Sequence, residues 1–179
     1  GHKEDINFSG KRVGMIGTGS TAIQIIPQVA KQAKHRHLFH RHANYRFPAR
    51  NGPLAEEKRT IHKKKYRELR KQAYSTPFGI AGYPPPEKGA FEATPKEREA
   101  KYHQKWDEGG TISYLFSYND LLLSEKSNET ASDFVRERIR EIVKDPETAE
   151  LLCPNDHPIG TKRICLDSGY YETFNRDNV

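Results

Sequence analysis

Cysteine, methionine and long apolar runs are scarce in this sequence of 179 residues. It has two cysteines, one methionine and one tryptophan, and hydrophobic residues make up 34% of it. Two thiols do not build a disulfide scaffold, and their scarcity favours a reducing compartment, of which the cytoplasm is the simplest. No stretch approaches the ~18 consecutive apolar residues of a membrane-spanning helix, so we predict no membrane segment. The low apolar content predicts a modest core and a chain cut from a larger protein.

Acidic residues are absent between Lys11 and Ala55, where eight lysines and arginines lie. The whole chain has a formal net charge of +6. A basic segment of this kind favours a polyanionic ligand, either a phosphorylated cofactor or a nucleic acid. Four histidines between positions 35 and 42 have no cysteine or acidic residue beside them, so we predict no metal site.

The segment from Lys11 to Phe39 has the pattern of two strands joined by a glycine turn and a helix. Lys11–Ile16 is a short apolar run, and Ala22–Ala33 carries apolar residues at helical spacing with Pro27 among them. His37–Phe39 is a second short run. This order predicts a βα–β unit, with a bend in the helix at the proline.

The downstream sequence predicts mostly helix and loop before a return to sheet. In chain order we expect a break at Tyr45–Pro53, one long solvated helix at Leu54–Tyr74 and a loop at Thr76–Pro95. Two helices should follow at Lys96–Glu108 and Ser127–Lys144, and Thr130 with Asp133 resembles a cap for the second. A short helix should begin at Asp145-Pro146, and a strand should form at Ile164–Leu166. The predicted fold class is therefore α/β: a Rossmann-like dinucleotide-binding domain with an incomplete sheet. Residues 1–53 form its first segment, 54–157 a large helical insertion, and 158–179 the return to the sheet.

The turn Gly17–Ala22 reads GTGSTA and fits the dinucleotide-binding fingerprint, with alanine at the third small position. The first glycine permits a tight turn, and the second lets the backbone approach a pyrophosphate. Backbone N–H groups at the helix N-terminus then hold the phosphates. The alternative is an ordinary glycine turn without a ligand. The predicted phosphate-binding residues are Gly17, Thr18, Gly19, Ser20 and Thr21.

The region about 20 residues beyond this turn decides between NAD and NADP. An NAD site usually has an acidic residue there for the ribose, whereas this sequence reads Leu38–His42 without an acid. Arg41 stands in that region, and its planar fork of donors suits a 2′-phosphate. The sequence therefore favours NADP, unless Arg41 merely faces solvent.

A second basic region, Lys63–Lys71, raises the possibility of a nucleic-acid-binding module. Glutamates at positions 56, 57 and 68 interrupt its charge, and no RNA- or DNA-binding motif accompanies it. A solvated helix face is the favoured interpretation, so we expect no nucleic-acid partner.

Three blocks together resemble the flavin-dependent Baeyer–Villiger monooxygenases of the cyclohexanone- and phenylacetone-monooxygenase type. They are Gly10–Pro27, Leu38–Pro53 and Pro158–Val179, and the last, PIGTKRICLDSGYYETFNRDNV, is the most specific. The blocks follow the family's order and approximate spacing. The helical stretch between them resembles the family's inserted helical subdomain.

The resemblance implies roles for particular residues. Arg41 and Lys162 would grip the 2′-phosphate of NADP, beside the phosphate-binding turn. His42 would also lie at the coenzyme, at a position where a small polar residue is common. Arg163 would be the active-site arginine, a fixed cation that stabilises negative charge as it develops during oxygenation of the ketone.

The resemblance also implies the activity of the whole enzyme. The chain would be the NADPH-binding domain of an FAD-dependent monooxygenase that uses oxygen to convert a ketone to an ester or lactone. The family's FAD-binding motif is missing, so an FAD-binding domain of the same polypeptide would be the partner and the fragment alone would be inactive. An N-hydroxylating or sulfur-oxidising flavin monooxygenase with a similar NADPH module is the alternative.

Overall fold

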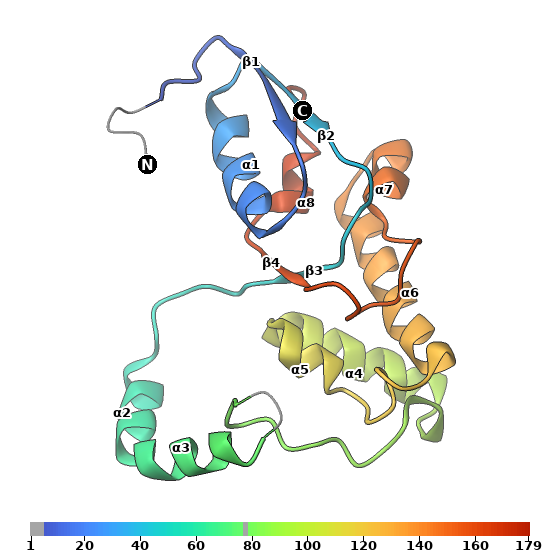
Figure 1. Ribbon diagram of the computed structural model, residues 1–179. Coiled ribbons are helices and arrows are strands. Elements are labelled where there is room, and N and C mark those ends of the chain that lie inside the picture. The colour runs from blue at the N-terminus through green and yellow to red at the C-terminus, as the bar shows by residue number, and fades with distance from the viewer. Residues whose placement is uncertain (1–5, 77–78) are drawn as a thin grey trace.

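The computed structural model describes residues 6–76 and 79–179, and its N-terminal part is a βα–β unit (Figure 1). Strand β1 (Arg12–Ile16), helix α1 (Ser20–Gln32) and strand β2 (His35–Phe39) follow one another. The two strands pair in parallel with Ile16 opposite Phe39. The predicted unit is confirmed, and β2 begins two residues earlier than expected. Pro27 lies buried inside a continuous α1.

Asn178, near the end of the sequence, caps the C-terminus of α1. The Asn178 side-chain amide donates to the carbonyls of Ala30 and Ala33, at 2.9 Å each. The Arg36 N–H in turn donates to the Asn178 carbonyl at 2.8 Å. Because the last carbonyls of a helix lack partners within it, this distant asparagine acts as a cap supplied from the other end of the sequence.

A second two-stranded parallel sheet joins residues far apart in the sequence. Strand β3 (Arg46–Pro48) pairs with strand β4 (Cys165–Asp167), and Phe47 lies opposite Leu166. The prediction of a mere break at Tyr45–Pro53 was therefore wrong. Pro48 ends the strand at the sheet edge, where proline is tolerated. The sheet is incomplete as predicted, but β4 pairs with β3 and not with the β1–β2 pair.

Helices dominate the region between β3 and β4. They are α2 (Glu56–Lys64), α3 (Tyr66–Tyr74), the short 3₁₀ helix η1 (Ala90–Glu92), α4 (Pro95–Glu108), α5 (Thr111–Leu115), α6 (Glu125–Ile142) and α7 (Pro146–Leu152). A last short helix, α8 (Tyr170–Thr173), follows β4 and lies beside α1. Figure 1 shows α2 and α3 set apart from the other helices.

The long helix expected at Leu54–Tyr74 is broken at Lys65 into α2 and α3. Neither helix has a buried residue, so no packing holds the two halves in line. The break also places basic residues in the last turn of α2 and Glu68 in the first turn of α3. Each charge then suits its helix dipole, which favours two helices over one. The loop expected at Thr76–Pro95 includes residues 77–78, which lie outside the described residues, and it contains η1.

Two helix caps illustrate one correct and one wrong prediction. Asp145 caps α7 as expected, accepting a hydrogen bond from the Thr148 N–H at 2.8 Å. Helix α6, however, is capped by Ser124, whose hydroxyl accepts from the Ser127 N–H at 3.3 Å. Thr130, the predicted cap, lies inside the helix because α6 begins earlier than the apolar pattern alone indicated.

Aromatic side chains form the core between the second sheet and the helices. Phe47 of β3 lies with its ring centroid 4.8 Å from that of Trp106 and 4.2 Å from that of Tyr114. Tyr102 and Phe134 extend the cluster at 5.6 Å. Because each such pair contributes about 0.5–1.5 kcal/mol beyond its area burial, this cluster fixes α4, α5 and α6 against the sheet.

Candidate functional site

The GTGSTA turn joins the carboxyl end of β1 to the N-terminus of α1. Gly17 has a φ of +98°, in the left-handed region that favours glycine, and its N–H donates to the Phe39 carbonyl at 2.8 Å. Gly19 is the N-cap of α1. A Cβ atom added at either glycine would meet nothing within 4 Å, so the space in front of the turn is open to a ligand.

A cavity of about 440 Å³ lies at this end of the first sheet, and part of its lining is apolar. Ile16 and Phe39, the last residues of β1 and β2, are 91% and 57% exposed there. The cavity is lined by Ile16, Gly17, Thr18, Phe39, His40, Arg41 and His42. It brings two of the predicted groups together, the glycine turn and the Arg41–His42 pair, at the sheet edge where dinucleotides bind in this fold class.

The return segment reaches the same region through an acidic residue that the sequence analysis did not single out. The Asp156 carboxylate lies 2.7 Å from His42 Nδ1 and 3.7 Å from Lys162 Nζ. His157 Nδ1 contacts the other carboxylate oxygen at 2.6 Å. The hydrogen bond from His157, together with the charges of Lys162 and His42, lowers the pKa of Asp156. Lys162 is therefore connected to His42 through this carboxylate.

Arg163 lies next to this cluster with its side chain exposed. Its carbonyl accepts a hydrogen bond from the Asn44 side-chain amide at 3.0 Å. Two residues further on, the buried Cys165 thiol lies 3.4 Å from the Ser20 hydroxyl. The return segment thus packs directly against the start of α1, whereas the Thr21 side chain is exposed.

Arg46 holds the GTGSTA turn through the Thr18 carbonyl, and the sequence analysis did not identify this role. Its guanidinium is fully buried, donates to the Thr18 carbonyl at 3.1 Å and to the Asn44 carbonyl at 2.8 Å, and lies 4.0 Å from the centre of the Tyr170 ring. The only sequence signal was weak: no acidic residue lies near Arg46 in this segment, so a buried arginine here has to use carbonyl groups and aromatic rings as partners.

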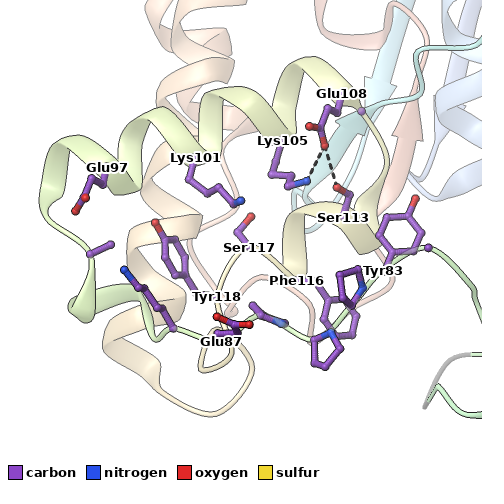
Figure 2. A pocket seen from close by; sticks show the side chains of 17 residues that line it. Tyr83, Glu87, Glu97, Lys101, Lys105, Glu108, Ser113, Phe116, Ser117 and Tyr118 are labelled. Carbon is purple, nitrogen blue, oxygen red and sulfur yellow. Dashed lines mark hydrogen bonds and ion pairs between the residues drawn. The ribbon is translucent and has the colours of Figure 1, made fainter.

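A larger cavity, of about 740 Å³, lies in the helical region between the Tyr83–Pro86 segment and helices α4 and α5 (Figure 2). Lys105 pairs with Glu108 at 2.7 Å, and the Ser113 hydroxyl lies 3.4 Å from the same carboxylate oxygen. None of the predicted coenzyme residues lines this cavity. It is therefore separate from the cavity beside the glycine turn.

Two further searches concern only residues 6–76 and 79–179. Within them, no three His, Cys, Asp or Glu side chains gather where they could hold a metal ion. In the same residues, no helix combines the length and the apolar character needed to cross a bilayer.

No protein-family model matches the chain, but individual proteins do. The 2-oxo-Δ3-4,5,5-trimethylcyclopentenylacetyl-CoA monooxygenase of Pseudomonas putida is 40% identical over 100% of this chain and 33% of its own length. Cyclohexanone 1,2-monooxygenase of an Acinetobacter species is 40% identical over 98% of this chain and 32% of its own. Phenazine N-monooxygenase of Lysobacter antibioticus is 35% identical over 98% and 32%.

Solved structures agree with these relatives. An oxidised steroid monooxygenase bound to NADP superposes on this chain with a TM-score of 0.90 at 46% identity, covering 97% of this chain and 33% of that one. The chain thus spans about a third of the length of the proteins it matches. Over that length it is a homologue of flavin-dependent monooxygenases. More narrowly, it corresponds to a segment of the Baeyer–Villiger monooxygenases, which confirms the resemblance in its sequence.

Proposed function

We propose that this chain is the NADPH-binding segment of an FAD-dependent Baeyer–Villiger monooxygenase that converts a ketone to an ester or lactone. The observation that carries the proposal is the contact of Lys162 with Asp156 and, through it, with His42. This contact ties Lys162 of the return segment to His42, which lines the cavity beside the glycine turn together with Arg41. The similarity over the whole chain supports the same conclusion.

The coenzyme is held mainly by backbone and by fixed cations. The open space before Gly17 and Gly19 admits the pyrophosphate, and the N–H groups of Thr18, Ser20 and Thr21 at the N-terminus of α1 hold it. Arg41 and Lys162 hold the 2′-phosphate, with His42 beside them. A guanidinium and an ammonium suit a phosphate because charged hydrogen bonds are the strong ones.

Arg163 serves the oxygenation step. When bound, FAD supplies the redox chemistry and the activation of oxygen. The Arg163 side chain is exposed, while its backbone carbonyl is anchored to Asn44, so the guanidinium is accessible to groups that the rest of the enzyme supplies. A positioned cation stabilises negative charge that develops at the ketone oxygen and lowers the barrier.

The parts of the whole enzyme follow from these roles. Residues 1–53 form the first coenzyme-binding segment, 54–157 a helical insertion, and 158–179 the return segment. The FAD-binding domain is part of the same polypeptide, and the ketone and oxygen meet between it and this segment. The enzyme acts in the cytoplasm, and the isolated chain does not oxygenate ketones.

The test is product analysis in the full-length protein that contains this chain. With NADPH, oxygen and cyclic or linear ketones, the unaltered protein should form lactones or esters. Arg163→Ala should abolish product formation while NADPH binding is retained, and Arg176→Ala, which also removes an exposed arginine of the return segment, should leave it intact. Normal lactone formation by Arg163→Ala would refute the assigned role.

A second candidate is oxygenation at nitrogen, which the similarity to the phenazine N-monooxygenase favours. The coenzyme module would be the same, because none of its residues touches the oxygenated atom. Incubation with aromatic N-heterocycles separates the two candidates: N-oxide without lactone would establish the second and overturn the first.

A further inference from the structure

Asp156 is the acidic group in a cluster of positively charged and titratable side chains. Its carboxylate contacts the imidazoles of His42 and His157 and the ammonium of Lys162, at 2.7, 2.6 and 3.7 Å. The side chain is 40% exposed, so water and ligands can reach it. Since residues 11–55 contain no acid, Asp156 supplies negative charge to this cluster from a different part of the sequence.

The charge of Asp156 is permanent near neutral pH. Hydrogen bonding from His157 and the charges of Lys162 and His42 lower the pKa of its carboxyl group, which is therefore ionised. Its negative charge cancels one of the two positive charges that Arg41 and Lys162 offer to a phosphate. A phosphate that approaches Lys162 therefore meets the like charge of Asp156, which already contacts Lys162 and His42.

We propose that Asp156 is a specificity-determining residue, a resident counter-ion that the 2′-phosphate of NADPH must displace from Lys162 and His42. This inference rests on the proposed function, because it concerns the same coenzyme. NADH carries no phosphate at that position and leaves the Asp156 contacts in place. Asp156 thereby limits the preference for NADPH and keeps Lys162 positioned when no coenzyme is bound.

His42 is the second partner that the phosphate must separate from Asp156. Asp156 faces His42 directly, His157 and Lys162 reach it through that carboxylate, and Arg41 adjoins it along the chain. Without the His42 contact the carboxylate has fewer partners and opposes the phosphate more strongly.

The first test removes the charge of Asp156 and keeps its shape. In the full-length protein, Asp156→Asn should tighten NADPH binding on the order of threefold to tenfold, the size expected of two charges a few ångströms apart at a wet surface. NADH binding should change less than about twofold by the same reasoning. The matched control is Asp107→Asn, an exposed carboxylate on α4 that lies 3.6 Å from Arg50 and should change neither affinity. Weaker or unchanged NADPH binding by Asp156→Asn would overturn the inference.

The second test uses His42→Gln and does not require the Asp156 variant to fold. This change should weaken NADPH binding and leave NADH binding nearly unchanged, because the Asp156 carboxylate loses the contact with the imidazole. An equal effect on both coenzymes, or none, would contradict the role of His42.

The outcomes separate this inference from the proposed function. A protein that prefers NADPH and loses the preference in Arg41→Ala, but is unaffected by Asp156→Asn, refutes only the inference. A protein without any NADPH preference refutes the proposed function itself.

Discussion

Replacement of Arg41 by alanine should remove most of the preference for NADPH over NADH. The Arg41 side chain is exposed at the cavity beside the glycine turn. Within the described residues its guanidinium has no ion-pair or hydrogen-bond partner, so its full charge is available to a phosphate. Lys162 differs, because its ammonium is 46% exposed and lies 3.7 Å from the Asp156 carboxylate.

This difference sets the expected magnitudes. A hydrogen bond to a charged group contributes about 1.5–3 kcal/mol, so Arg41→Ala should reduce the ratio of NADPH to NADH affinity by about 10- to 150-fold. Lys162 gives up an existing ion pair when it binds the phosphate, and exposed pairs are worth up to about 1 kcal/mol. Lys162→Ala should therefore reduce the ratio less, by about twofold to 30-fold, after that pair is discounted.

The assay is calorimetric titration of the full-length protein with each coenzyme at one fixed ionic strength. Arg67→Ala on α3 is the matched control, because it removes an exposed arginine from a helix without buried residues. An unchanged ratio in Arg41→Ala would refute the assignment of the 2′-phosphate site. A larger effect of Lys162→Ala than of Arg41→Ala would refute the reasoning from the ion pair.

Two predictions concern stability. The buried Asn128 side chain donates to the Ile159 carbonyl at 2.8 Å and accepts from the Ile159 N–H at 3.0 Å. Asn128→Ala should therefore lower the free energy of unfolding, measured by urea titration, by about 2–4 kcal/mol. Asn119→Ala, which removes an exposed asparagine, should lower it by much less. The carboxylates of Glu97 and Asp145 cap α4 and α7, and hydrogen bonds from a threonine in each cap lower their pKa values. The stabilisation of the folded state by these carboxylates is complete above their pKa values in the unfolded chain and is lost as pH falls through their pKa values in the folded protein. Glu97→Gln and Asp145→Asn should therefore make folding stability, followed by circular dichroism, less dependent on pH in the acid range. An unchanged dependence would contradict this.

Local signals made the first part of the site predictable. The run Arg12–Ile16, the GTGSTA turn and the apolar spacing of α1 each depend on neighbours in the sequence, and the structure forms them as expected. Helix α4 begins one residue before the expected Lys96–Glu108; Gly109 ends it as expected, and the local Thr94–Glu97 capping box at its start was a signal that the sequence analysis did not use. Such elements follow from dihedral preferences and hydrogen bonds within a few residues.

The elements that the sequence did not reveal depend on distant contacts. Strand β3 exists because Arg46–Pro48 pairs with residues about 120 positions later, and three residues ending in proline carry no strand signal of their own. The role of Asp156 likewise depends on His42 and Lys162 meeting in space. The expected helix at Leu54–Tyr74 is broken at Lys65, where neither half has a buried residue that would hold the two in line.

The placement of Arg46 has a consequence for the order in which the protein is made. This side chain links the Thr18 carbonyl to the Tyr170 ring, and Asn178 caps α1. During synthesis the N-terminal βα–β unit leaves the ribosome before the rest of the chain. Until the whole helical region has emerged, Arg46 has its carbonyl partners Thr18 and Asn44 but lacks the Tyr170 ring, and α1 lacks the cap that Asn178 supplies.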